Sequence, residues 1–484
     1  MMEKQVLNNI IKDCRTPAYV FDESVLAAHV QNIRKYLSEN ISLCYAMKAN
    51  PFLTKLMSGL VDRLEVCSPG EYDICIKHNI NPGQIVVSGV NKTEESMRHI
   101  MSYSKGSGIY TIESPMHYSI IRKLVICSQE VQSGENPHGD AGECEMINEP
   151  APVGNVDYNG KINVMLRLSA GNQFGMDKET LMNTLTRIKE DDLVGICGIQ
   201  YYSGTQKTEK KMITELKMLE ELGKELTVAG FSDLELEYGP GLFISYFDDG
   251  KAIKSEDVEE EDSYGRQDGL YEQLTTLNNT LSGISCYRHI SIELGRYIAA
   301  LCGLYITKII DIKHTKDTNY IIIDGGIHQI NYYGQMMGMK LPYIKHIKRA
   351  DNDILQKDAV DNSSDNVDDR MVDNSSEDDD NRMSDNYPGD DDNKMSGREQ
   401  EESTGQYTIC GSLCTTNDVL VRKAILDSPS PGDILVFEKC GAYSVTEGMA
   451  LFLSRELPQV LLAKQDGSVE MMRDIIETSE FNCG

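Results

Sequence analysis

A lysine closes one of the first β-rich runs of the chain. The segment YAMKANP holds Lys48 at the end of the run over residues 42–48. An amine at the tip of a strand is well placed to form a Schiff base with the carbonyl group of a cofactor. A lysine taken by itself is more often a plain surface residue, so its role depends on the groups around it.

Three further segments offer groups that suit an anion and a ring nitrogen. In EYGPGL, Gly239 and Gly241 let backbone N–H groups approach an anion closely, although the same pattern also makes a plain tight turn. In SGTQ, Thr205 adds a hydroxyl group for the same anion. In ELGRY, the Arg296 guanidinium suits a phosphate and the Glu293 carboxylate suits a protonated pyridine nitrogen.

These segments follow strands in a regular alternation of strands and helices. Helix-like stretches separate most of the β-rich runs, which span residues 42–48, 63–67, 84–89, 108–112, 162–168, 197–203, 234–238 and 289–294. This alternation predicts an α/β fold, a parallel (β/α)8 barrel of the TIM type. Active sites of such barrels lie at the C-terminal ends of the strands, which is where the residues above fall.

The chain after Tyr297 is strand-rich and predicts a second, mostly β domain, built as a small barrel or sandwich. We therefore expect a barrel domain over residues 20–285 and a β domain formed by residues 1–19 and 286–484. Each domain holds one insertion. The barrel carries a Gly- and Pro-rich loop at 128–160, and the β domain carries an acidic segment at 350–405.

The acidic insertion is a tandem repeat with a period of 12 residues, beginning VDNSSDNVDDRM and VDNSSEDDDNRM. Residues 351–404 hold 19 Asp and Glu against 5 Lys and Arg. Few of these side chains can bury apolar surface, so the composition predicts disorder. The spacing does not meet the EF-hand pattern, and we interpret the segment as a solvated loop rather than a calcium site.

Composition excludes several classes of partner. A net charge of -29 argues against nucleic acid, which needs a basic face. No apolar run approaches the roughly 18 residues of a membrane span, and the N-terminus lacks a secretory signal. The 13 cysteines form no CxxC pairs, which predicts free thiols and no metal site. We therefore expect a soluble, cytoplasmic protein.

Taken together, the motifs resemble those of the fold-type III decarboxylases that use pyridoxal 5'-phosphate (PLP), a family with diaminopimelate, ornithine and arginine decarboxylases. They occur in the family's order along nearly the whole chain. The matching segments are TPAYVFD, YAMKANP, LEVCSPGE, LRLSAGNQFGM, GIQYYSGTQ, EYGPG, ELGRY, CGSLCTTNDVL and GAY.

The resemblance implies a role for each candidate residue. Lys48 would carry PLP as a Schiff base, Glu293 would pair with the pyridine nitrogen, and Tyr202 would stand at the position of the family's ring-stacking histidine. The phosphate would be held by Thr205, Gly239, Gly241, Arg296 and Tyr443. Substrate would meet Asp324, Cys414 and Tyr443. Cys414 and Tyr443 would reach the active site of the other subunit in a head-to-tail homodimer, with Cys414 as proton donor or, alternatively, a plain buried thiol.

Some positions depart from the family pattern. Tyrosine before GTQ is similar to decarboxylases that act on aminoacyl groups tethered to carrier proteins. The turn Asp324–Gly325–Gly326 is not followed by the Arg-Pro pair of diaminopimelate decarboxylases, and Thr415 follows Cys414 where those enzymes have a glutamate. These departures argue against diaminopimelate itself, and we expect the substrate to be an amino acid of the diaminopimelate, ornithine or lysine kind, or a carrier-tethered aminoacyl group. Pro240 also removes one backbone donor from the glycine-rich loop.

Two other functions use the same scaffold. An amino-acid racemase or epimerase of this fold places an arginine near the ring nitrogen, so Glu293 favours decarboxylation. A non-catalytic regulator that binds PLP or a protein partner would lack Lys48 or Cys414, and both are present.

Overall fold

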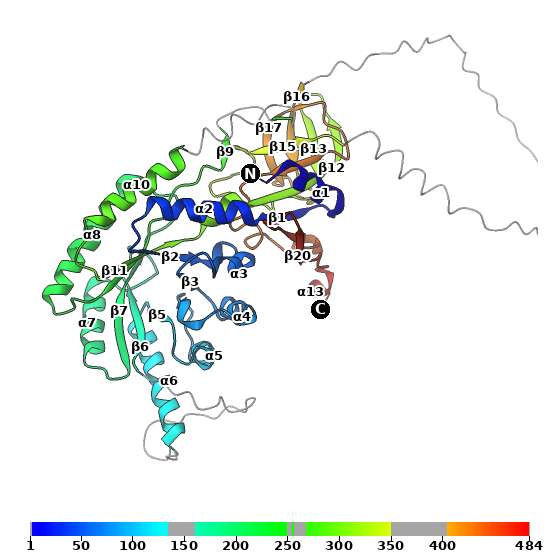
Figure 1. Cartoon of the computed structure of the whole chain (residues 1–484). Coiled ribbons are helices and arrows are strands. Elements are labelled where there is room, and N and C mark those ends of the chain that lie inside the picture. The colour runs from blue at the N-terminus through cyan, green and yellow to red at the C-terminus, as the bar shows by residue number, and fades with distance from the viewer. Residues whose placement is uncertain (1, 134–159, 249–253, 256–267, 350–403, 484) are drawn as a thin grey trace, which may run out of the picture.

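The computed structural model describes residues 2–133, 160–248, 254–255, 268–349 and 404–483 (Figure 1). Its first unit is a closed barrel of eight parallel strands in the order β11-β2-β3-β4-β5-β6-β7-β8. The strands are β2 (Ile41–Ala46), β3 (Arg63–Val66), β4 (Ile85–Val87), β5 (Ile109–Ile112), β6 (Ile162–Arg167), β7 (Val194–Tyr202), β8 (Glu235–Gly239) and β11 (His289–Leu294). The predicted (β/α)8 barrel is confirmed.

Helices surround the barrel on its outside (Figure 1). They are α2 (Glu23–Tyr36), α3 (Thr54–Met57), α4 (Pro69–Lys77), α5 (Glu94–Ser104), α6 (Pro115–Ser133), α7 (Lys178–Lys189), α8 (Glu209–Val228) and α10 (Asp268–Ser282). Short polar residues fix where several of them begin. The Ser68 side chain accepts a hydrogen bond from the backbone N–H of Glu71, and Thr93 and Ser96 form a capping box at α5. Among the described helices, none is long and apolar enough to span a membrane.

The second unit is a ten-stranded sheet that combines both ends of the chain. The strand β1 (Ala18–Asp22) runs antiparallel to β12 (Gly303–His314) and parallel to β19 (Gln459–Ala463). The other strands of this sheet are β10 (Lys254–Ser255), β13 (Asn319–Ile323), β15 (Ile344–Ile347), β16 (Thr404–Cys410), β17 (Val419–Asp427), β18 (Ile434–Phe437) and β20 (Val469–Arg473). The expected C-terminal β domain is therefore present. The helices α1 (Lys4–Asp13) and α13 (Ser479–Asn482) both lie beside it (Figure 1).

The strand pairings shift some of the expected domain limits. The eighth barrel strand, β11, lies after residue 285, so that boundary is too early, and the boundary at 20 cuts through β1 of the β domain. The insertion expected from 128 begins later, because α6 continues to Ser133. β16 starts at Thr404, inside the expected acidic insertion. The rest of both insertions falls outside the described residues, apart from Gly160.

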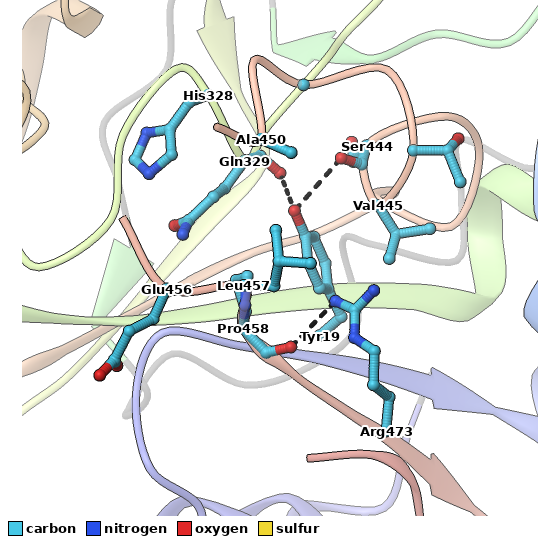
Figure 2. Close-up of a pocket in the computed structure, with 12 residues that line it drawn as sticks. Tyr19, His328, Gln329, Ser444, Val445, Ala450, Glu456, Leu457, Pro458 and Arg473 are labelled. Carbon is cyan, nitrogen blue, oxygen red and sulfur yellow. Dashed lines mark hydrogen bonds between the residues drawn. The ribbon is translucent and has the colours of Figure 1, made fainter. Parts of the chain in front are cut away.

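A small cavity of about 30 Å³ lies in the β domain beside Tyr19 of β1 and Arg473 of β20 (Figure 2). His328, which is 4% exposed, lines it, and neither ring nitrogen of His328 has a hydrogen-bond partner among the described residues. Burial, with a smaller effect of the nearby Arg455, lowers the pKa of His328 to about 4. The folded protein therefore holds this imidazole neutral where an unfolded chain would begin to protonate it.

This difference predicts a pH-dependent contribution to stability. Because the pKa of His328 is lower in the folded state, its neutral form favours folding above about pH 6.5, and stability is lost as pH falls toward 4. Between pH 7 and pH 5 we expect His328→Leu to gain about 2 kcal/mol in free energy of unfolding relative to the unsubstituted protein. Urea denaturation of both proteins at the two pH values measures this difference. If the difference in free energy of unfolding between the two proteins were the same at pH 7 and pH 5, protonated His328 would have a partner in the cavity.

Candidate active site

Lys48 stands at the C-terminal mouth of the barrel, on a short 3-10 turn (Met47–Ala49) that follows β2 directly. Its Nζ lies 2.6 Å from Glu65 Oε2, 3.3 Å from Glu293 Oε1 and 3.7 Å from Cys67 Sγ. Burial alone would lower the pKa of Lys48. The two carboxylates outweigh that effect and hold the pKa well above its usual value. Lys48 is therefore a cation in this arrangement, paired with buried acids.

Three buried glutamates from three barrel strands lie in this part of the site, and two of them contact the amine of Lys48. Glu65 comes from β3, Glu237 from β8 and Glu293 from β11, and each is at most 7% exposed. Burial, together with the neighbouring Glu65, raises the pKa of Glu293, whereas Lys48 holds the pKa of Glu65 low despite its burial. Burial raises the pKa of Glu237 to about 7. Burial thus disfavours the charged form of Glu293, and cations such as the ammonium of Lys48, 3.3 Å away, favour it.

The glycine-rich loop after β8 packs against the turn after β7. A Cβ atom on Gly239 would lie 2.5 Å from Tyr202 Cδ2. A Cβ atom on Gly241, whose φ is +60°, would lie 2.2 Å from the carbonyl oxygen of Gly204 and 3.1 Å from Thr205 Cα. Only glycine permits this close approach. The loop and the Thr205 turn therefore form a tightly packed backbone cradle of the glycine-rich kind that can bind an anion.

Arg296 lies at the start of the short helix α11 (Arg296–Ala299) and is enclosed by tyrosine rings. Its Cζ lies 4.4 Å from the centre of the Tyr443 ring, 5.0 Å from that of Tyr333 and 5.7 Å from that of Tyr246. Nη1 donates a hydrogen bond to the Tyr246 hydroxyl at 3.1 Å, and the buried Nε has no partner among the described residues. The guanidinium thus keeps a donor for a further acceptor.

Tyr443 reaches the barrel of its own chain. Its backbone N–H donates to the carbonyl oxygen of Ala49 at 2.7 Å, directly beside Lys48, and the side chain of Asn50 donates to the carbonyl oxygen of Gly441. A Cβ atom on Gly441 would lie only 1.9 Å from the Ala299 carbonyl oxygen, so the GAY segment packs tightly on the barrel mouth. Within this chain Tyr443 therefore lies at the mouth of its own barrel, whereas its service to the other subunit stays a prediction.

Cys414 and Asp324 lie elsewhere in the β domain. Asp324 accepts hydrogen bonds from Thr16 Oγ1 and Thr307 Oγ1, each at 2.6 Å, and from the backbone N–H of Lys308 at 2.9 Å. Both of its carboxylate oxygens are thus engaged by the β domain itself. Cys414 is exposed in the turn between β16 and β17. Among the described residues, neither makes a hydrogen bond or ion pair with Lys48, Glu293 or Arg296.

Several residues of the site were missed from the sequence. Glu65 and Glu237 are charged residues within short β-rich runs, and a carboxylate inside a barrel strand is a signal that could have found them. Gln200 donates a hydrogen bond to Glu237 at 2.8 Å from the neighbouring strand. Tyr246 and Tyr333 carry no such signal, because their loops have no recognisable motif.

These groups fit PLP. The glycine cradle with Thr205 and the free Nε donor of Arg296 suit the phosphate, the buried Glu293 suits the ring nitrogen, and Lys48 suits the carbonyl carbon. Lys48 Nζ lies 5.8 Å from the centre of the Tyr202 ring, which places an aromatic face beside the amine. When bound, PLP supplies a ring that withdraws negative charge from the substrate α-carbon.

Comparison with known proteins agrees with this fit. Residues 23–149 match the pyridoxal binding domain of pyridoxal-dependent decarboxylases, and residues 371–441 match their C-terminal sheet domain. The L-glutamyl-[BtrI acyl-carrier protein] decarboxylase of Niallia circulans is 24% identical over 98% of this chain and 94% of its own. Diaminopimelate decarboxylase of Helicobacter pylori strain J99 is 22% identical over 95% and 93%.

Solved structures show the same fold. The Helicobacter pylori diaminopimelate decarboxylase complexed with L-lysine has a TM-score of 0.66 at 18% identity and covers 98% of both chains. A lysine/ornithine decarboxylase from Vibrio vulnificus has a TM-score of 0.62 at 14% identity, with coverage of 95% and 97%. Parts of both domains of the chain are therefore similar to the pyridoxal-dependent decarboxylases of the ornithine, diaminopimelate and arginine decarboxylase family, and its cofactor is pyridoxal 5'-phosphate.

Proposed function

We propose that this enzyme decarboxylates an aminoacyl group carried on a carrier protein, in preference to free diaminopimelate, ornithine or lysine. The observation that carries the proposal is the absence of charge in the segment after the Gly325–Gly326 turn. From Ile327 to Met339 it contains no Asp, Glu, Lys or Arg, and its Tyr333 packs on Arg296 at the site.

Free diaminopimelate has an ammonium and a carboxylate at its far end. Burying such groups without partners of opposite charge is costly. The segment that borders Arg296 offers no such partner, and the residues after Cys414 are Thr415 and Thr416. A distal carboxyl group that is tied up in a covalent link to a carrier carries no charge. The relative from Niallia circulans, whose name specifies a carrier-bound glutamyl substrate, supports the same choice.

The residues of this chain would divide the work as follows. Lys48 would bind the cofactor covalently, and Glu65 holds the free amine in place. Glu293 would pair with the ring nitrogen and stabilise its proton, which favours loss of CO2 over racemisation. Thr205, Gly239, Gly241, Arg296 and Tyr443 hold the phosphate, and Tyr202 packs against the ring.

Cys414 would return a proton to the α-carbon from the second subunit of a head-to-tail homodimer. Its exposure in this chain suits a residue that acts across an interface. Exposed apolar side chains of the β domain also suit subunit contact; they are Met336, Met337, Met339, Met449, Leu451, Phe452 and Leu453. The free thiols suit a reducing, cytoplasmic location.

The substrate proposal is tested by measuring CO2 release from matched pairs of compounds. Free lysine, ornithine, arginine, diaminopimelate and glutamate are compared with glutamyl and diaminopimelyl groups that are linked through their distal carboxyl to a pantetheine-loaded carrier protein, which leaves the α-carboxylate free. We expect CO2 from a thioester, with glutamyl tested first, and at least about 100-fold less kcat/KM for the free acid. Efficient release from free diaminopimelate or ornithine would overturn the carrier proposal and leave the decarboxylase assignment intact.

A further inference from the structure

A buried ion pair lies directly behind the glycine-rich loop. The side chains of Lys207 and Glu215 are 2% and 8% exposed, and Lys207 Nζ lies 2.8 Å from Glu215 Oε2. Lys207 follows the SGTQ turn, and Glu215 belongs to the helix α8 that covers the barrel at this point. An isolated buried pair of this kind contributes little to stability, because desolvation offsets the attraction.

Lys207 holds the loop at two points. Its Nζ donates a hydrogen bond to the carbonyl oxygen of Gly239 at 2.8 Å, and its backbone N–H donates to the carbonyl oxygen of Gly241 at 2.8 Å. Lys207, the residue directly after the SGTQ turn, thus fixes both glycines that flank Pro240. The Nζ also lies 5.6 Å from the centre of the Tyr202 ring. The same ring borders the amine of Lys48.

These two bonds decide which way the peptides of the loop face. In a trans peptide the C=O and N–H groups point in opposite directions. Fixing the Gly241 carbonyl oxygen to Lys207 therefore turns the N–H of Leu242 away from Lys207. The ammonium group of Lys207 also compensates the partial negative charge of the Gly239 carbonyl oxygen, which would otherwise repel a phosphate. This matters here because Pro240 has no N–H of its own to offer.

The partner of Lys207 is held just as firmly. Glu215 accepts hydrogen bonds from the Tyr238 hydroxyl at 2.8 Å and from the Ser203 hydroxyl. Tyr238 lies on β8, one residue before Gly239, and Ser203 lies in the SGTQ turn. The carboxylate therefore joins α8 to both segments of the cradle and keeps the ammonium group of Lys207 in place.

We propose that Lys207, oriented by Glu215, is a positioning residue for the phosphate of the cofactor, which it serves by holding the Gly239–Gly241 loop and the Thr205 turn together with their carbonyl oxygens turned away. This inference rests on the proposed role of that loop in phosphate binding. Lys207 does not touch the phosphate, so its loss should weaken cofactor binding without removing the covalent link at Lys48.

The test compares Lys207→Met with the matched control Lys224→Met, which removes another lysine that pairs with a glutamate of α8 but lies on the solvent side. PLP is titrated into each apoprotein, and the phosphorus NMR shift of the bound phosphate is recorded. We expect the dissociation constant of Lys207→Met to rise about tenfold to 100-fold, with a changed phosphorus shift, and that of Lys224→Met to stay within about twofold.

A second variant guards against misfolding. The double change Lys207→Met with Glu215→Met removes the whole buried pair and leaves no unpaired charge, so it is expected to fold with a thermal midpoint near that of the unsubstituted protein. A dissociation constant and phosphorus shift unchanged in this double variant would overturn the inference. If the unsubstituted protein bound no PLP at Lys48, the proposed function would fail instead, which separates the two results.

Discussion

Replacing Lys48 by alanine is expected to abolish the covalent attachment of PLP and to lower the rate of decarboxylation by about 10⁴-fold or more. The amine is held by the turn after β2 and lies within 3.3 Å of the carboxylates of Glu65 and Glu293. A positioned amine of this kind has an effective concentration of at least about 10⁵ M, which free amines in solution do not replace. Borohydride reduction followed by peptide mass spectrometry measures the attachment, and CO2 release measures the rate.

Lys92 provides the matched control for this experiment. It is also buried in the barrel, donates to the carbonyl oxygen of Gly89, and burial lowers its pKa to about 8. On basicity alone it is the more reactive amine, because more of it is neutral at pH 7. We expect Lys92→Met to retain the modified Lys48 peptide. Modification of Lys92 in the unsubstituted protein would contradict the assignment of Lys48.

The local part of the site could be predicted from the sequence because parallel strands all end at the same face of a barrel. Lys48, Thr205, Gly239 and Glu293 lie at or just after the C-terminal ends of four different strands, so recognising the strands was enough to bring the residues together. The helix and strand pattern was equally readable, since strand residues are buried on the barrel and polar caps such as Ser68 mark helix starts.

What the sequence did not reveal depends on contacts between distant parts of the chain. The position of the GAY segment is set by two hydrogen bonds to residues almost 400 positions away, from Asn50 to the Gly441 carbonyl oxygen and from the Tyr443 N–H to Ala49. Nothing in the GAY segment indicates which barrel it covers. The roles of Glu65 and Lys207 likewise depend on distances across the barrel. The predicted limit at residue 20 falls within β1 for a related reason, because β1 pairs with β12 and β19 rather than with its neighbours in sequence.

Mixing two inactive variants is expected to restore activity if Cys414 acts across a subunit interface. Lys48→Ala and Cys414→Ala each disable both sites of their own homodimer. In a hybrid head-to-tail dimer, one site receives both damaged residues and the other receives neither. Random assortment gives half hybrids, each with one intact site, so about a quarter of the unsubstituted activity should return. The two variants are unfolded together, refolded as a mixture and assayed for CO2 release.

The matched control mixes Lys48→Ala with Glu293→Gln. These residues lie 3.3 Å apart within one chain, so every site of a hybrid dimer keeps one defect, and no activity should return. Tyr443 belongs with this pair, because its backbone is bonded to Ala49 beside Lys48. Recovery with Cys414→Ala but not with Glu293→Gln would therefore mean that Lys48 and Glu293 come from one chain and that Cys414 comes from the other. Failure of the Cys414 mixture, with hybrids present by mass spectrometry, would mean that the proton comes from a group on the same chain as Lys48.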